Sequence, residues 1–176
     1  LAASRTGPSH VRRITSSSGG KPRSARSALT TAFLLLVTPS GNDAAMAIAE
    51  HVGGGSIESF VEMMNGKAQE LGLRNTHFTN PHGLDEDGHY SSAYDLAMIS
   101  RYALKDPLFA KMVSAQEITI KASRTFALYN NNRLLGQPQW VPGVDGVKTG
   151  LTDNAGDSLV ASATRNGHRV IVAVLG

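Results

Sequence analysis

The pair Asn166-Gly167 lies between two segments rich in valine and isoleucine, and it is the strongest constraint that this sequence places on the fold. Both residue types tolerate the positive φ angles of a type I′ turn, and the flanking residues 158–164 and 168–175 have the composition of β-strands. The pair therefore predicts a tight antiparallel hairpin. Further strands are expected at residues 146–152 and, shorter, at residues 117–121 and 124–128.

Helical patterns precede these strands. Residues 43–51 form a segment dense in alanine, and Ser56 begins an amphipathic segment that Gly72 ends. The apolar residues expected on one face of this second helix are Ile57, Phe60, Val61, Met64, Ala68 and Leu71. Residues 32–37 fit either the end of an apolar helix or a buried strand.

Two more helices are expected after a long polar loop at residues 75–90. One begins at Ser92, whose spacing to Asp95 is that of a capping box, and the other covers residues 106–113. Helices first and antiparallel strands last indicate an α+β fold in which helices pack on an antiparallel sheet.

The net positive charge of the sequence comes from the first thirty residues. Residues 1–30 contain six basic residues and no acidic one, whereas residues 31–176 carry more acidic than basic side chains. We expect residues 1–30 to be a disordered basic head, because they have few large apolar side chains to bury. Residues 31–176 are expected to be one domain, and its charge gives no reason to expect a nucleic-acid partner.

Several classes of protein are excluded by what the sequence lacks. It has no cysteine, so disulfides, thiolate catalysis and cysteine-ligated zinc are excluded. No run approaches the roughly 20 apolar residues that span a bilayer. Residues 32–37 are too short an apolar stretch to make a convincing signal peptide.

Two short motifs carry side chains suited to catalysis or substrate binding. Ser40-Gly41-Asn42 follows Pro39, and it places a hydroxyl and an amide in one turn. Residues 148–150, Lys-Thr-Gly, combine a cation, a hydroxyl and a small residue on a predicted strand, which suits binding of a carboxylate along a strand edge. Each motif alone also has an ordinary explanation: Asn42 as a helix cap, and Lys148 as a solvated strand lysine.

Together, in this order, the motifs resemble two of the three signatures of penicillin-binding proteins and serine β-lactamases. The sequence from about residue 34 to residue 176 resembles the low-molecular-weight D-alanyl-D-alanine carboxypeptidases in particular. The segments that carry the resemblance are residues 39–45 (PSGNDAA), 75–78 (NTHF), 82–85 (HGLD), 90–93 (YSSA), 145–150 (DGVKTG) and 159–164 (LVASAT). The middle segments favour the carboxypeptidases over a β-lactamase, the third possibility considered.

The resemblance implies a β-lactamase/transpeptidase-like fold, incomplete at both ends. It also implies a serine-type peptidase of the bacterial cell envelope. Such an enzyme removes the terminal D-alanine from peptidoglycan stem peptides ending in D-Ala-D-Ala, and it is inhibited by β-lactams. The implied catalytic residues are Ser40, Asn42 and Lys148. The implied substrate-binding residues are Thr149, Gly150 and Leu151, with the Leu151 N–H in the oxyanion hole. No cofactor or metal is implied, and the histidines near Asp85 match no zinc or calcium pattern.

The family's third signature, a Ser-x-x-Lys that supplies nucleophile and base, should precede Ser40. Only residues 18–21 match this spacing, and Gly19 and Gly20 oppose the helix that would hold Ser18 beside Lys21. We therefore interpret the nucleophile motif as absent. The alternative to an active carboxypeptidase is a non-catalytic remnant, or a module that binds peptidoglycan peptides or β-lactams weakly. In either case we expect marginal stability and an uncovered apolar surface.

Overall fold

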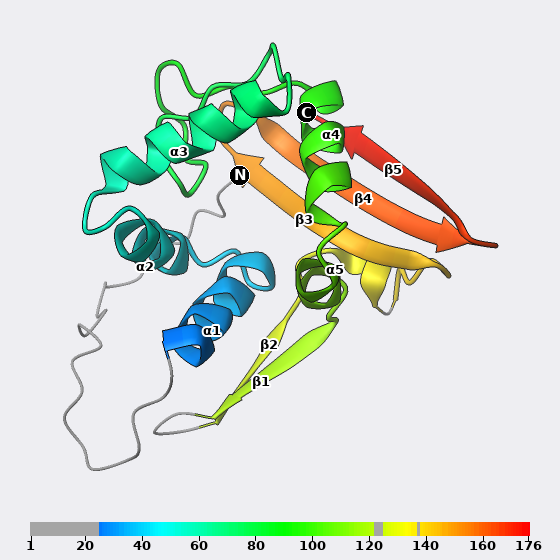
Figure 1. The fold of residues 1–176 in the computed structure, drawn as a ribbon. Helices are drawn as coiled ribbons and strands as arrows, with labels where there is room; N and C mark the ends of the chain where they lie inside the picture. The colour runs from blue at the N-terminus through cyan, green and yellow to red at the C-terminus, as the bar shows by residue number, and fades with distance from the viewer. Residues whose placement is uncertain (1–24, 122–124, 137) are drawn as a thin grey trace.

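The computed structural model describes residues 25–121, 125–136 and 138–176, which form helices followed by antiparallel strands (Figure 1). The helices are α1 (Ala25–Val37), α2 (Asn42–Val52), α3 (Ile57–Glu70), α4 (Ala93–Ala103) and α5 (Pro107–Val113). The strands are β1 (Glu117–Lys121), β2 (Thr125–Tyr129), β3 (Val144–Thr152), β4 (Gly156–Arg165) and β5 (His168–Val174), with a 3-10 turn, η1 (Arg133–Leu135), before β3. The expected α+β order is confirmed.

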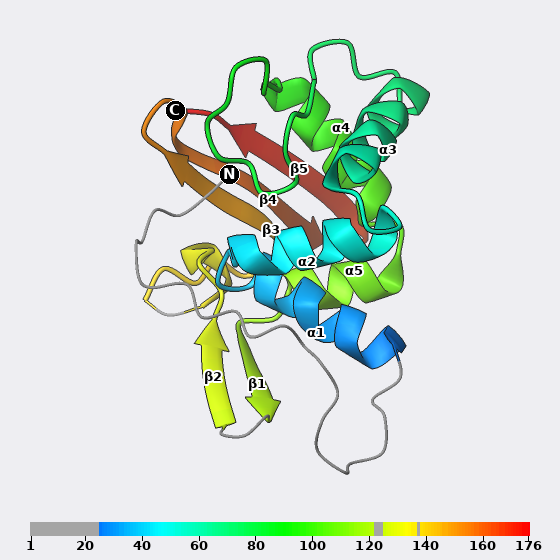
Figure 2. The ribbon, with the colours of Figure 1, turned by 90° about the vertical axis from the view of Figure 1, so that its left-hand side faces the viewer.

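The main sheet has three antiparallel strands in the order β3-β4-β5. Asn166 and Gly167 join β4 to β5 with φ angles of 50° and 77°, so the predicted hairpin turn is confirmed. Strands β1 and β2 form a separate two-stranded ribbon that projects from one end of the molecule (Figure 2). Strand β2 includes residues 125–128 of the expected strand and continues to Tyr129, while Arg124 lies outside the described residues.

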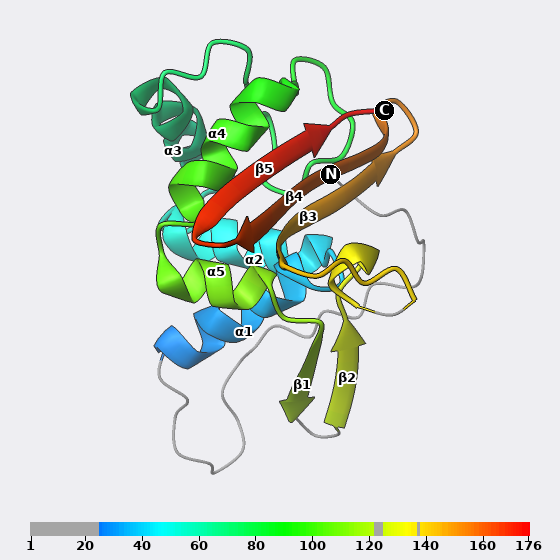
Figure 3. The same cartoon turned by 90° about the vertical axis from the view of Figure 1, so that its right-hand side faces the viewer.

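The described helices lie on one face of the main sheet, and Figure 3 shows the opposite face with no described helix over it. Along β5, Ile171 and Ala173 pack toward the core. Val170, Val172 and Val174 alternate with them and are 51–60% exposed. The expected uncovered apolar surface is therefore present on this part of the chain.

Helix α1 begins before the predicted domain boundary at residue 30. Residues 32–37 belong to this helix, which excludes the alternative of a buried strand. The helix also includes residues 25–30, the last part of the segment expected to be disordered. Its apolar end accounts for this difference, because Phe33, Leu34 and Val37 pack into the core and stabilise the helix through tertiary contacts. Residues 1–24 lie outside the described residues.

The caps of α3 and α4 follow the sequence signals with one difference. Ser56 accepts a hydrogen bond from the Ser59 N–H at the start of α3, and Gly72, with a φ of 70°, ends the helix. Ser92 caps α4 by accepting from the Asp95 N–H. The Asp95 carboxylate does not complete a capping box. It is buried and accepts hydrogen bonds from the backbone N–H of Asn75 and the hydroxyl of Thr76, both at 2.8 Å.

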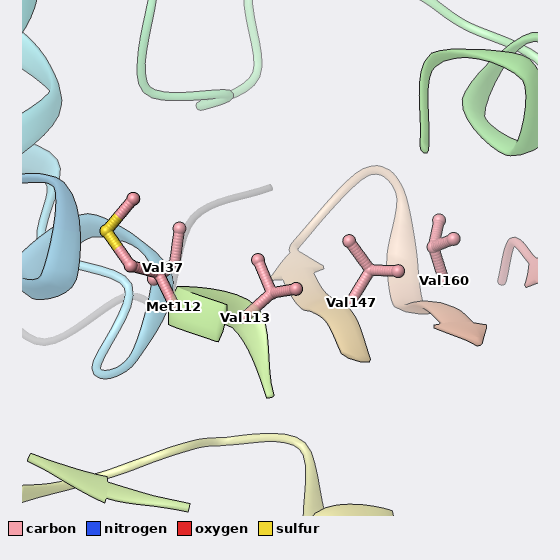
Figure 4. Close-up of a cluster of buried hydrophobic side chains, with 5 residues drawn as sticks. All are labelled: Val37, Met112, Val113, Val147 and Val160. Atoms are coloured by element: carbon pink, nitrogen blue, oxygen red, sulfur yellow. The ribbon is translucent and has the colours of Figure 1, made fainter. Parts of the chain in front are cut away.

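The core joins helices to the sheet through small and medium side chains. Its buried members are Val37, Met112, Val113, Val147 and Val160 (Figure 4). These residues come from α1, α5, β3 and β4, so contact through α5 connects the end of α1 to the middle of β3. This contact sets the position of the turn that follows α1.

Candidate active site

Ser40 lies in the tight turn between α1 and α2. It is a non-glycine residue with a φ of 59°, a conformation that costs free energy for a residue with a side chain. The Gly41 N–H donates to the Leu35 carbonyl at 3.0 Å, and a Cβ on Gly41 would lie only 3.0 Å from that same oxygen. The close approach of the turn to α1 therefore favours glycine at position 41.

Asn42 is the first residue of α2 and not its cap. The N-cap is Gly41, which has no side chain to make a capping hydrogen bond. The alternative that Asn42 merely caps the helix is therefore wrong. Its side chain instead lines the same cavity as Ser40.

Lys148 reaches the turn from the middle of β3. Its Nζ donates a hydrogen bond to the Ser40 Oγ, which is 108 residues away in the sequence. It also donates to the Thr149 carbonyl at 2.8 Å. The two motifs that the sequence analysis singled out are thus in direct contact.

The surroundings of Lys148 are unusual for a lysine. Burial from water lowers the pKa of its side chain to about 8, because desolvation disfavours the charged form. Within the described residues no carboxylate lies at ion-pair distance from Nζ. About a tenth of Lys148 is therefore uncharged at neutral pH.

A cavity of about 780 Å³ opens beside these groups. Its polar lining includes Ser40, Asn42, Lys148 and Ser158. The Ser158 hydroxyl is buried and has no hydrogen-bond partner among the described residues. Its apolar lining includes Val37, Ile99, Phe109 and Val160. The cavity thus pairs a small polar cluster with apolar walls, the usual character of a small-molecule site.

The other predicted site residues lie next to Lys148 but do not line this cavity. Thr149 and Gly150 continue β3, which in the described part of the chain has a partner strand on one side only. Leu151 follows them and is half exposed. Ser18 and Lys21, the only residues with Ser-x-x-Lys spacing, lie outside the described residues.

A contact between the polar loop and the end of β3 was not expected from the sequence. Asp85 accepts a hydrogen bond from the Thr152 hydroxyl at 2.7 Å and from the Asn154 N–H at 3.2 Å. Thr152 follows Leu151 directly, so the loop at residues 75–90 supports the strand end beside the site. No local signal marks this pair, because the two residues are 67 positions apart.

The histidines of this loop serve its internal hydrogen bonds. His77 Nδ1 contacts the Gly88 carbonyl at 2.8 Å, and His89 Nδ1 accepts from the Thr79 N–H at 3.1 Å. Burial lowers the pKa of His82 and of His89. In the described part of the chain, no cluster of three or more histidine, cysteine or carboxylate side chains is arranged to hold a metal ion.

The arrangement of helices and sheet matches solved structures. The Streptomyces K15 DD-transpeptidase aligns with a TM-score of 0.79 and 37% identity, over 84% of this chain and 60% of that one. DacD of Francisella tularensis, a D-alanyl-D-alanine carboxypeptidase, aligns with a TM-score of 0.75 and 28% identity, over 83% of this chain and 46% of that one. The fold is therefore the transpeptidase-like α+β fold.

The sequence matches one family within that fold. A family model described as D-alanyl-D-alanine carboxypeptidase covers residues 17–176. The chain is 48% identical over 139 residues to the carboxypeptidase DacF of Bacillus subtilis and 46% identical over 138 residues to DacA of Escherichia coli. The chain belongs to the D-alanyl-D-alanine carboxypeptidase family, a family of serine-type peptidases.

The chain is much shorter than these relatives. The alignments cover 78% of this chain but only 35% of DacF and 33% of DacA, so it spans about a third of their length. No helix among the described residues is long and apolar enough to cross a membrane.

Proposed function

We propose that this chain binds peptidoglycan stem peptides ending in D-Ala-D-Ala, in a serine carboxypeptidase site between the α1–α2 turn and the edge of β3. The observation that carries the proposal is the hydrogen bond from Lys148 Nζ to Ser40 Oγ, which joins two of the family's three motifs across 108 residues. A cavity with a polar cluster beside the contact provides room for the end of a peptide.

Each predicted residue has a role that suits its chemistry. The Asn42 amide lines the cavity and is able to hydrogen-bond the peptide backbone, while Lys148 supplies positive charge. Thr149 and Gly150 would bind the terminal carboxylate along the free edge of β3, as in strand addition. The Leu151 N–H would donate to the developing oxyanion.

Hydrolysis requires, in addition to binding, an activated nucleophile that forms the acyl-enzyme. In this proposal Ser40 passes a proton toward the leaving group, and the nucleophile comes from a Ser-x-x-Lys motif. Because Gly19 and Gly20 oppose a helix at residues 18–21, binding without turnover is the second candidate function. We expect the protein to act at the bacterial cell envelope, where its substrate is found, and to admit β-lactams as mimics of that substrate.

Binding is tested with a fluorescein-labelled peptide ending in L-Lys-D-Ala-D-Ala, followed by fluorescence anisotropy. We expect saturable binding that the L-Ala-L-Ala isomer does not compete for, and at least about tenfold weaker binding for Lys148→Met. Lys111→Met is the control, since Lys111 is exposed on α5 and does not line the cavity. Equal binding of the two isomers would refute the proposal.

Turnover is tested separately by release of D-alanine from the same peptide and by labelling with a fluorescent penicillin. An active carboxypeptidase would release D-alanine, and Ser18→Ala would abolish both the release and the labelling. Peptide binding without D-alanine release, unaffected by Ser18→Ala, would establish the non-catalytic alternative.

A further inference from the structure

The side chain of Lys148 has the surroundings of a reactive amine. It is largely buried at the wall of the cavity beside apolar groups from α1, α5 and β4. Its hydrogen bonds go to a hydroxyl and a carbonyl, and neither of these groups carries a charge to balance an ammonium ion. Lysines that are desolvated in this way are the ones that act as nucleophiles in proteins.

We propose that Lys148 is itself an acyl acceptor, and that β-lactams bound in the cavity modify its amine to give a stable amide. This inference goes beyond the proposed function, on which it rests only in requiring that the site admit β-lactams. It assigns to Lys148 a covalent chemistry that differs from the electrostatic role proposed above.

The reaction balances without any further reactant. The neutral Nζ of Lys148 attacks the lactam carbonyl carbon, and a new C–N bond forms as the C–N bond of the ring breaks. The ring nitrogen takes up the proton that the lysine nitrogen loses. The Ser40 hydroxyl, which already contacts Nζ, is placed to accept that proton and deliver its own to the ring nitrogen.

Ring strain explains why β-lactams are the class that reacts. Opening a strained cyclic amide to form an ordinary amide is downhill, whereas exchange between two unstrained amides has no such driving force. Stem peptides would therefore bind without modifying Lys148. The product would also persist, because an amide resists the water and hydroxylamine that cleave a serine ester.

The reaction needs the uncharged amine, so its rate depends on pH. Burial lowers the pKa of Lys148 to about 8, and the uncharged fraction therefore rises about tenfold between pH 7 and pH 9. The other titratable side chains that line the cavity all belong to the loop between α3 and α4, and they are His82, Asp85, Glu86, Asp87, His89 and Tyr90. Titration of His82 and His89 lies below this window, since burial lowers the pKa of both.

The test is incubation of the full chain with benzylpenicillin, followed by intact-mass and peptide mass spectrometry. We expect one adduct with the mass of the whole β-lactam, located on Lys148, which blocks tryptic cleavage there and survives neutral hydroxylamine. Its rate of formation should increase about tenfold from pH 7 to pH 9. Lys148→Arg should lose the adduct, and Ser40→Ala should slow its formation several-fold.

Lys111→Arg is the matched control and should react like the parent protein. If Lys148→Arg does not fold, as judged by circular dichroism, location of the adduct in the parent protein decides the question. A hydroxylamine-labile adduct on a serine, or one spread evenly over the exposed Lys67, Lys105 and Lys111, would overturn the inference. No adduct at all, with D-Ala-D-Ala binding retained, would overturn it and leave the proposed function standing, whereas loss of both would reject both.

Discussion

At the scale of single residues, two side chains at the site adopt states that are costly for folding. Ser40 has a left-handed backbone conformation, and Lys148 gives up its hydration without gaining an acidic partner in the described structure. Such costs are common where groups are held for binding or catalysis. A substitution that removes the cost at either residue should therefore raise the free energy of unfolding while weakening the function of the site.

For Lys148, the sign of the effect on stability follows from its lowered pKa. The unfolded chain holds the lysine proton up to about pH 10.5, whereas the folded chain releases it near pH 8. The free-energy cost of burying the charged lysine therefore has its full size below about pH 8. This cost disappears as the pH rises toward 10.5. We expect Lys148→Met to raise the free energy of unfolding at pH 7 by up to about 3 kcal/mol and to have less effect at pH 10.

Urea unfolding of the two proteins at both pH values checks this prediction. Lys111→Met, at an exposed position, provides the control for removal of a lysine as such. A difference in stability that does not change with pH would contradict the argument from desolvation.

For Ser40, the positive φ makes glycine the better residue for folding. We expect Ser40→Gly to raise the free energy of unfolding by about 1 kcal/mol while weakening binding of the D-Ala-D-Ala peptide, since the hydroxyl that accepts from Lys148 is removed. Ser40→Ala removes the same hydroxyl but keeps the strained backbone, so it should show the loss of binding without the rise in stability. Thermal unfolding and anisotropy of the three proteins separate these effects.

At the scale of elements, the long loop between α3 and α4 supports the end of β3. Two aspartate side chains make the connections, and both accept hydrogen bonds. Asp95 fixes the beginning of the loop from inside α4, and Asp85 fixes the turn between β3 and β4. The loop is therefore part of the framework of the site.

Asp85→Ala should release the β3–β4 turn, because the Thr152 hydroxyl and the Asn154 N–H both lose their acceptor. We expect faster amide hydrogen exchange at Asn154 and a loss of about 1–3 kcal/mol in the free energy of unfolding. Asp87→Ala is the matched control, since the structure shows no hydrogen bond to the Asp87 side chain among the described residues. Equal exchange rates in the two variants would exclude a supporting role for Asp85.

At the scale of the whole molecule, the uncovered face of the sheet is the main feature that an ordinary soluble domain would not show. Val170, Val172 and Val174 form an exposed apolar row on β5. Figure 3 shows that β5 is also an edge strand of the described sheet. Exposed apolar edge strands favour association between molecules. The described part of the chain should therefore self-associate more readily than a domain of similar size whose edge strands are covered.

Val172→Lys should reduce that association without loss of stability, because the side chain is already about half exposed. Light scattering over a range of protein concentrations measures the effect. Met63→Lys on α3 is the control, with similar exposure at a site away from the sheet. A parent protein that stays monomeric at all concentrations and melts cooperatively would contradict both this prediction and the expectation of marginal stability.

The local structure could be predicted from the sequence, because it depends on residues close together in the chain. The hairpin at Asn166-Gly167 follows from backbone preferences of those two residues, and the face of α3 follows from the spacing of its apolar residues. The start of α1 could not be predicted in this way. Core packing of its apolar residues 33–37 stabilises the helix, which begins at Ala25, several residues before them. The family resemblance was also visible in the order of the short motifs.

The site as a set of contacts was decided only by the tertiary structure. The sequence contains Ser40, Lys148, Asp85 and Thr152, but nothing local brings the members of each pair together across 108 and 67 positions. Burial of Lys148, and with it the lowered pKa, arises from packing of α1, α5 and the sheet around one nitrogen. Short-range preferences fix which elements form, whereas the reactivity of a side chain depends on the solvent and charges around it, and those exist only once the elements have packed.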